Sequence, residues 1–159
     1  MLDKFEKALV IYQDLEKKQP HNIFYAQKLA ACYQQLQQYA NAEKLLKEKL
    51  QRMGQPMLYV ELGYNHQLQK DMPNAEKNYK AALDAIADNP SNVYNVASTF
   101  EQKVLLEQAI KAYAKAVEVN PNLNFDYQVA LLQGQLGNVE LMIQKLLSYA
   151  YNNPQNLMV

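Results

Sequence analysis

Alanines recur along this chain at an almost constant interval. The recurring residues are Ala8, Ala42, Ala75 and Ala109, with spacings of 34, 33 and 34 residues. A large side chain follows each of them four residues later, namely Tyr12, Leu46, Tyr79 and Tyr113. A fixed period in the range of about 20 to 50 residues is typical of arrays of stacked repeat units. This period therefore restricts the chain to a repeat architecture.

The repeat unit is predicted to contain two helices. Helical stretches cover 24–38, 57–70, 93–105 and 125–138, and each precedes a second helical stretch. Proline, usually beside Asn, ends the second stretch, because proline cannot continue a helix and Asn tolerates turn geometry. Gly54 stands where the first of these prolines is expected, and it can end the helix in a left-handed conformation. We expect helices of about 13 to 15 residues joined by tight turns.

With this period and this two-helix unit, the sequence resembles the tetratricopeptide repeat family. The family pattern places large, small and aromatic residues at fixed positions, with Ala at positions 20 and 27 and Pro at 32. The residues that carry the resemblance are Ala26, Leu29, Ala30, Tyr33, Ala42 and Leu46; Tyr59, Leu62, Gly63, His66, Ala75, Tyr79 and Ala82; Val96, Ala97, Phe100, Ala109, Tyr113, Ala116 and Pro121; and Val129, Ala130, Leu136, Gly137 and Pro154. In the last, degenerate copy Met142 replaces the expected alanine.

The resemblance implies an all-α, right-handed α-solenoid of antiparallel helix pairs with about four and a half repeats. The expected parts are a lone second helix over 2–20 and repeats over 23–55, 56–89, 90–122 and 123–156. A helical hairpin cannot bury its apolar face alone, so small residues are expected where helices stack closely. Because the chain opens on a second helix and stops at 157–159, we expect a fragment of a longer repeat protein. The alternative is that Met1 is the true start and that 2–18 is a cap.

Charge and composition exclude several classes of partner. Sixteen basic and sixteen acidic residues cancel, so no net field attracts nucleic acid or an anionic membrane. Arg52 is the only arginine, which makes phosphate recognition unfavourable. No apolar run approaches the length of a membrane span, and no leader pattern opens the chain. The single cysteine, Cys32, allows no intrachain disulfide and leaves the compartment undetermined.

No catalytic constellation is predicted, and neither a cofactor nor a metal is expected. His21 lies beside a proline and His66 occupies an aromatic packing position, so both are interpreted as packed or solvent-exposed. Cys32 is expected to behave as a small buried hydrophobe. Carboxylates with lysines close by are expected on solvated helix faces; they are Glu43, Glu61, Glu76 and Glu107.

Function is therefore expected on the concave surface that stacking creates, lined by the first helix of each repeat. The predicted binding residues are Phe24, Gln27, Gln34, Val60, Tyr64, Gln67, Tyr94, Ser98, Glu101, Tyr127 and Leu131. Glu101 is the one charged residue in this set, which is otherwise rich in Tyr and amides. Such a mixture favours an extended peptide or a protein surface, because Tyr combines apolar area with a hydroxyl group.

Two roles known in the family can be compared with this surface. Repeats that bind the acidic tails of heat-shock chaperones use a clamp of Lys and Asn, and Gln27, Ala31, Ser91 and Asn95 stand at the corresponding positions here. The resemblance therefore implies a protein-interaction scaffold without this clamp and without enzymatic activity. The alternative is a structural module that forms homodimers through its open ends. Independently of these two roles, Tyr64, Tyr94 and Tyr127 could only cover the interior of the superhelix and contact no partner.

Overall fold

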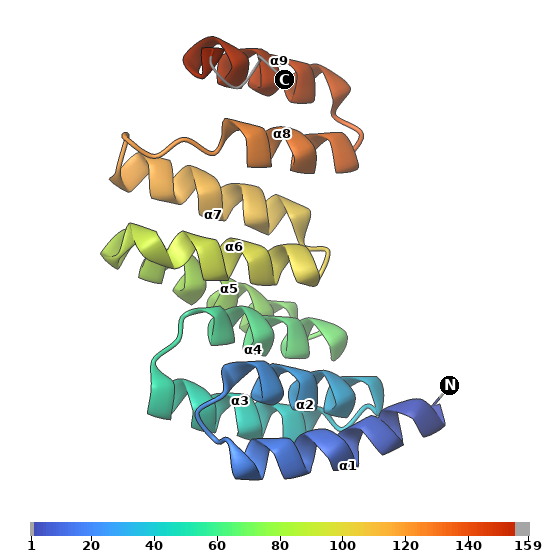
Figure 1. Ribbon diagram of the computed structural model, residues 1–159. Coiled ribbons are helices and arrows are strands. Elements are labelled where there is room, and N and C mark those ends of the chain that lie inside the picture. The colour runs from blue at the N-terminus through green and yellow to red at the C-terminus, as the bar shows by residue number, and fades with distance from the viewer. Residues whose placement is uncertain (1, 155–159) are drawn as a thin grey trace. The chain divides into compact units, whose positions relative to one another are not determined.

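The computed structural model describes residues 2–154, and these residues form nine α-helices and one 3₁₀ helix without any β-strand (Figure 1). The helices are α1 (Leu2–Lys18), α2 (Ile23–Gln35), α3 (Tyr39–Met53), α4 (Met57–Leu68), α5 (Met72–Asp88), α6 (Val93–Gln102), α7 (Leu106–Val119), α8 (Asp126–Gln135) and α9 (Val139–Asn152), with the 3₁₀ helix η1 (Pro90–Asn92) before α6. The all-α class is confirmed. The residues at 157–159, where another repeat was expected to open, lie outside the described part.

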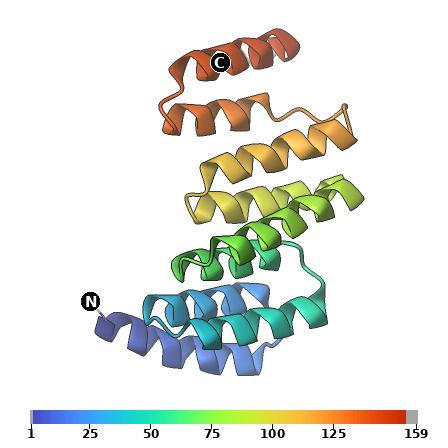
Figure 2. The same cartoon turned by 180° about the vertical axis from the view of Figure 1, so that it is seen from behind.

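The helices belong to two compact units, Met1–Ala82 and Leu83–Val159, and the boundary between them lies inside α5. Helices α2 and α3 pack against each other in the first unit, and α6 with α7 and α8 with α9 do so in the second. Each of these pairs is an antiparallel hairpin, seen from both sides in Figures 1 and 2. The division of the chain into four and a half repeats stays a prediction.

Small residues lie where helices meet in the first unit, as the period predicted. Ala42 and Ala75 are fully buried. Gly63 of α4 faces the ring of Tyr79, and a Cβ atom at position 63 would overlap this ring. A fully buried core forms around Ala30, Leu46 and Leu58, with Leu62 beside them. The alanines and the glycine therefore permit the close helix approach that the large residues then fill.

A left-handed residue recurs in every turn inside a helix pair. These residues are Gln37 (φ 58°), Lys70 (φ 62°), Val104 (φ 58°) and Gly137 (φ 80°). The next residue donates its N–H to the carbonyl five positions earlier, in the pairs Gln38–Tyr33, Asp71–His66, Leu105–Phe100 and Asn138–Gln133. This bond is the Schellman cap of a helix. Gly54 ends α3 in the left-handed conformation (φ 61°), as predicted.

Two charged residues are buried in the first unit, and the sequence analysis placed one of them wrongly. Glu61 was expected on a solvated face, but it is 1% exposed. Its side chain faces α2, where Gln27 Nε2 donates to Glu61 Oε1 at 3.0 Å. Lys49, also 1% exposed, stands where the next two repeats have alanine. Its Nζ contacts the Glu16 carboxylate and donates to the Pro20 carbonyl at 2.9 Å. These bonds link α3 to the end of α1.

The second unit is unevenly packed. Ala109, Ala112 and Ala116 of α7 are fully buried, and the rings of Tyr113 and Phe125 lie with their centroids 4.8 Å apart. By contrast, no side chain of α9 is buried. The tight core of this unit is therefore built on α6 and α7, since α6 buries Val96, Ala97 and Phe100 as well.

Candidate protein-binding surface

The predicted binding residues lie on α2 and α4 of the first unit and on α6 and α8 of the second, and we call them the first-helix surface. The exposed members are Phe24, Tyr94, Ser98, Tyr127 and Leu131. The half-buried members are Gln27, Tyr64, Gln67 and Glu101, and the buried members are Gln34 and Val60.

Two of the predicted residues therefore belong to the interior. Val60 is fully buried, because α4 is covered on most sides and Leu58, Leu62 and Gly63 beside it are buried as well. Gln34 is 4% exposed, and its Nε2 has no hydrogen-bond partner within the described structure. The expectation that Val60 and Gln34 are exposed was wrong. The period fixes the position of a residue along the helix, but it does not show how far neighbouring helices bury that residue.

The exposed part of the first unit is an aromatic group at the start of α2. Phe24 is 51% exposed and packs edge-to-face against Tyr25, with ring centroids 5.8 Å apart. Lys28 Nζ lies 5.1 Å from the centroid of the Phe24 ring, which is within the range of a cation–π contact. Asn22 caps this helix by accepting the N–H of Phe24. A ring held in this way offers apolar area beside a positive charge.

Gln67 and Glu101 of the surface are held by tyrosines of the following helices. Tyr79 Oη donates to Gln67 Oε1 at 2.8 Å, and Tyr113 Oη donates to Glu101 Oε1 at 2.9 Å. Donor and acceptor are 12 residues apart in both cases. This repeated spacing was visible in the sequence, but the bond was not predicted. It orients the two acceptors rather than leaving them free for a partner.

Burial of these tyrosines changes their acidity. The pKa of Tyr79 is raised well above its usual value, first by burial and then by the charges of Tyr64 and Glu61. The pKa of Tyr113 is raised in the same direction by burial, followed by the hydrogen bond to Glu101 and its charge. Both hydroxyls are therefore donors throughout the neutral range.

The exposed part of the second unit carries ordered aromatic rings. Tyr94 is 59% exposed, and its ring packs against that of the buried Phe125 at a centroid distance of 5.8 Å. Tyr127 is 44% exposed and stacks on Tyr149 at 5.4 Å. Leu131 follows Tyr127 by one helical turn and is 47% exposed. Rings fixed by neighbouring rings lose little conformational entropy when a partner binds.

The candidate catalytic residues are not arranged as a reactive group. Cys32 is buried, and burial raises the pKa of its thiol although the charge of Lys28 acts in the opposite direction. His66 is mostly buried, with Nδ1 3.3 Å from an Asp71 oxygen and Nε2 3.9 Å from a Glu43 oxygen. In the described part of the chain, no cluster of three or more His, Cys, Asp or Glu side chains could hold a metal ion. No helix of that part is long and apolar enough to cross a membrane.

The stacked helix pairs and their period define a helical-repeat protein of the tetratricopeptide type. Proteins of this type are typically non-catalytic, and the fold supports protein–protein interaction in general. The family model for the coatomer epsilon subunit, itself tetratricopeptide-like, matches residues 2–90, and the chain belongs to this family.

Individual proteins show the same likeness. Tetratricopeptide repeat protein 21A of Homo sapiens is 30% identical over 131 residues, which are 80% of this chain and 10% of the human protein. This chain thus spans about a tenth of that relative. The crystal structure of BtubC (BKLC) from P. vanneervenii has a TM-score of 0.54 at 20% identity, over 95% of this chain and 72% of that one. YrrB, described as a TPR protein with an unusual peptide-binding site, has a TM-score of 0.44 at 16% identity, over 96% and 79%.

Proposed function

We propose that this protein is a non-enzymatic interaction scaffold that binds an extended peptide or a partner surface through the first-helix surface. The observation that carries the proposal is the exposure of Tyr94, Tyr127 and Leu131 on α6 and α8, where the tyrosine rings are fixed by ring contacts. Tyrosines of this kind often contribute a large part of binding energy. The matching family is named for a subunit, which is in keeping with a role in assembly.

The surface is also suited to a neutral partner. Gln27 offers its amide oxygen and Gln67 its amide nitrogen, since the other group of each amide is already bonded within the protein. Ser98 offers a hydroxyl that accepts from Gln102 at 3.3 Å. The charge of Glu101 is engaged by Tyr113. Lys28 beside Phe24 carries a charge at the start of α2, but the exposed tyrosines of α6 and α8 do not. We therefore expect added salt to change an affinity carried by Tyr94 and Tyr127 only slightly.

A capture experiment tests the proposal. The partner is isolated from the source cell with the wild-type chain, and its affinity is then measured for Tyr94→Ala/Tyr127→Ala and for Tyr151→Ala, an 88% exposed tyrosine of α9 outside the surface. The double variant should bind at least about thirtyfold more weakly. The control should bind as the wild type does. Equal affinity of all three proteins would overturn the proposal.

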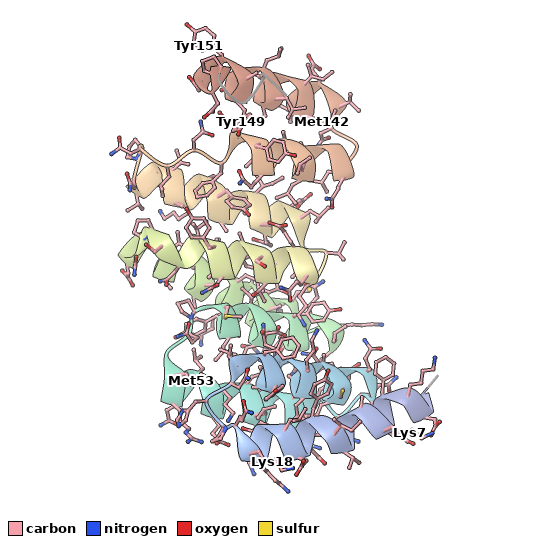
Figure 3. The ribbon with its side chains drawn as sticks, viewed as in Figure 1. Lys7, Lys18, Met53, Met142, Tyr149 and Tyr151 are labelled. Atoms are coloured by element: carbon pink, nitrogen blue, oxygen red, sulfur yellow. The ribbon has the colours of Figure 1, made fainter. Side chains whose placement is uncertain are left out.

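A second candidate function, self-association, is favoured by the exposed face of α9. Ile143, Leu147 and Tyr151 follow one another at intervals of four residues and are 49%, 66% and 88% exposed. Figure 3 shows Tyr151 projecting from this helix. Two copies could pair these faces about a twofold axis, and a contact of one helix against another is small for a stable interface, so the dimer would be weak.

Molar mass measured across a dilution series distinguishes the two functions. Self-association predicts a concentration-dependent dimer that Leu147→Glu abolishes and that Gln144→Glu, at an exposed position of the same helix, preserves. A monomer at all concentrations, with the loss of partner affinity described above, leaves the scaffold as the better account.

A further inference from the structure

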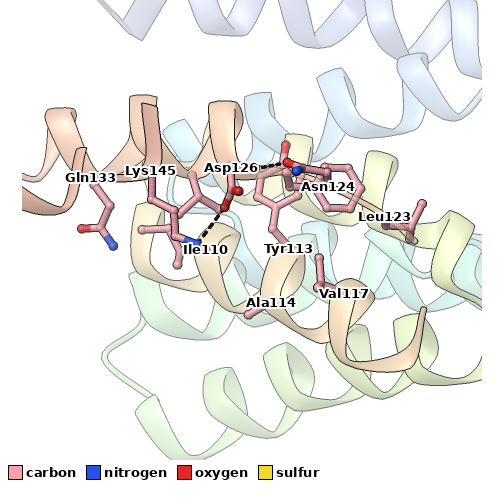
Figure 4. Close-up of a pocket in the computed structure, with 11 residues that line it drawn as sticks. Ile110, Tyr113, Ala114, Val117, Leu123, Asn124, Asp126, Gln133 and Lys145 are labelled. Carbon is pink, nitrogen blue, oxygen red and sulfur yellow. Dashed lines mark hydrogen bonds and ion pairs between the residues drawn. The ribbon is translucent and has the colours of Figure 1, made fainter. Parts of the chain in front are cut away.

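A cavity of about 480 Å³ opens in the second unit between α7, the loop before α8, α8 itself and α9 (Figure 4). Its volume falls within the range of known ligand pockets. Most of its wall is apolar, from Ile110, Ala114, Val117, Leu123 and Val129. This site shares no residue with the first-helix surface.

The apolar wall on α7 has a cause in the sequence. The positions of Ile110 and Ala114 are occupied by Glu43 and Lys47 in the first repeat and by Glu76 and Lys80 in the second. Lys47 and Glu43 form an ion pair of 2.6 Å on the surface of α3. A charged pair is what a solvated helix face normally carries. Its replacement by two apolar residues in α7 suits a face that a ligand covers.

The space itself comes from a second substitution. Gln133 of α8 borders the cavity and stands at the position that Tyr33, His66 and Phe100 occupy in the earlier repeats. Phe100 is fully buried there and fills the corresponding interior. A flexible amide takes the place of a packed ring in the last pair, so the interior stays open and gains a polar group.

One end of the cavity carries a neutral polar pair. Lys145 Nζ lies 2.8 Å from Asp126 Oδ1, and Ser148 Oγ donates to Asp126 Oδ2 at 2.8 Å. The backbone N–H of Asp126 donates to Asn124 Oδ1 at 2.9 Å, and Figure 4 shows the bonds from Asp126 to Lys145 and Asn124. Carboxylate and ammonium together provide an acceptor and a donor without net charge. Such a pair complements an amide, which has an N–H and a C=O, better than a charged group.

We propose that this cavity binds one bulky aliphatic or aromatic side chain of a partner peptide, with the adjoining backbone amides at the Asp126–Lys145 pair. The apolar wall receives the side chain, and the volume leaves room for part of its backbone. That the ligand is a peptide rests on the proposed scaffold function, whereas the site is a different one.

Capped amino acids test the site without a partner. The ¹⁵N-labelled full chain is titrated with N-acetyl-leucine amide, N-acetyl-alanine amide and decanoate, and backbone shifts are followed by NMR. The leucine compound should shift residues of α7, α8 and α9 with saturation, and it should bind at least about tenfold more tightly than the alanine compound, because it buries more methylene groups. Equal binding of the two amides, or binding of decanoate alone, would overturn the proposal.

Two variants test whether the NMR shifts caused by the leucine compound arise from binding in the cavity. Ile110→Glu/Ala114→Lys gives α7 the charged pair of the earlier repeats, a pair that those helices already tolerate, and should abolish the leucine effect. Lys111→Ile changes an exposed residue of the same helix and should preserve it. Retained binding in the double variant counts against the site. Failure here leaves the scaffold function standing, because the Tyr94 and Tyr127 variants test that function at another surface.

Discussion

At the residue scale, Tyr113 joins two parts of the second unit. Its ring packs on Phe125, and its hydroxyl donates to Glu101. Because the folded state raises the pKa of this hydroxyl, the unfolded chain ionises first as the pH rises. The contribution of Tyr113 to stability should therefore be complete below about pH 10 and be lost above it.

The variant Tyr113→Phe isolates this effect. It removes the ionisable hydroxyl and keeps the ring, so other titrating groups act equally in both proteins. The free energy of unfolding of both proteins is measured in denaturant from pH 7 to pH 11. The wild type should lose stability relative to the variant at the alkaline end of this range. A difference that stays constant over this range would mean that the hydroxyl is equally solvated in both states.

The alanines of α7 give a second prediction at this scale. Ala109 is fully buried and Lys111 is exposed. Ala109→Leu should overpack the helix contact at a cost of roughly 1–3 kcal/mol in the free energy of unfolding, measured by denaturant melts. Lys111→Leu serves as the matched control and should change little. Equal losses at the two positions would mean that this face of α7 is not the packed one.

Single residues also show where sequence reasoning stops. The buried alanines could be predicted, because the period alone places them at helix contacts. The burial of Lys49 and Glu61 could not, since each depends on a partner about one repeat away, Glu16 for Lys49 and Gln27 for Glu61. A charged residue at a position where other repeats have alanine, as at Lys49, was the available signal.

At the element scale, the four turns inside the helix pairs share one backbone geometry although their residues differ. All four turns contain one left-handed residue, but it is Gly in the last pair alone. A β-branched side chain is the least suited to this conformation. Val104 therefore stands in a strained position in the turn between α6 and α7, with 75% of it exposed and little packing to lose.

We expect Val104→Gly to stabilise the protein by about 1 kcal/mol, because glycine adopts the left-handed conformation without steric cost. Val10→Gly is the control: Val10 is 66% exposed inside α1, where glycine should destabilise by a similar amount. Thermal and denaturant unfolding of both variants give the two signs. A loss of stability in Val104→Gly would show that contacts of the valine outweigh its backbone strain.

At the scale of the whole chain, the period predicted which helices exist and in which order, but not which side chains they leave accessible. Phe24, Tyr94 and Tyr127 are exposed as expected, whereas Val60 is fully buried. The cavity beside α7 was not predicted either, although the change from Glu and Lys to Ile110 and Ala114 was visible in the sequence. Exposure depends on how neighbouring repeats cover a face, and a single-repeat pattern does not contain that information.

Uneven packing should also make the helices of one unit differ in local stability. Helices α7 and α9 have 14 residues each, but α7 has four buried residues and α9 has none. Helix α9 packs against α8 and borders the cavity through Lys145, and it has no buried side chain to expose when it opens. Repeat proteins are stabilised by interfaces between neighbours, and a weak interface permits local unfolding.

Hydrogen exchange of the native protein measures this difference. After correction for intrinsic rates, the backbone amides in the middle of α9 should exchange at least about tenfold faster than those in the middle of α7, which corresponds to about 1.4 kcal/mol in the free energy of opening. The comparison needs no variant, because both helices share one molecule, one pH and one temperature. Saturation with N-acetyl-leucine amide should slow exchange in α9 by bridging it to α7, while the alanine compound should not. Equal protection of the two helices in the free protein would contradict the loose packing inferred for α9.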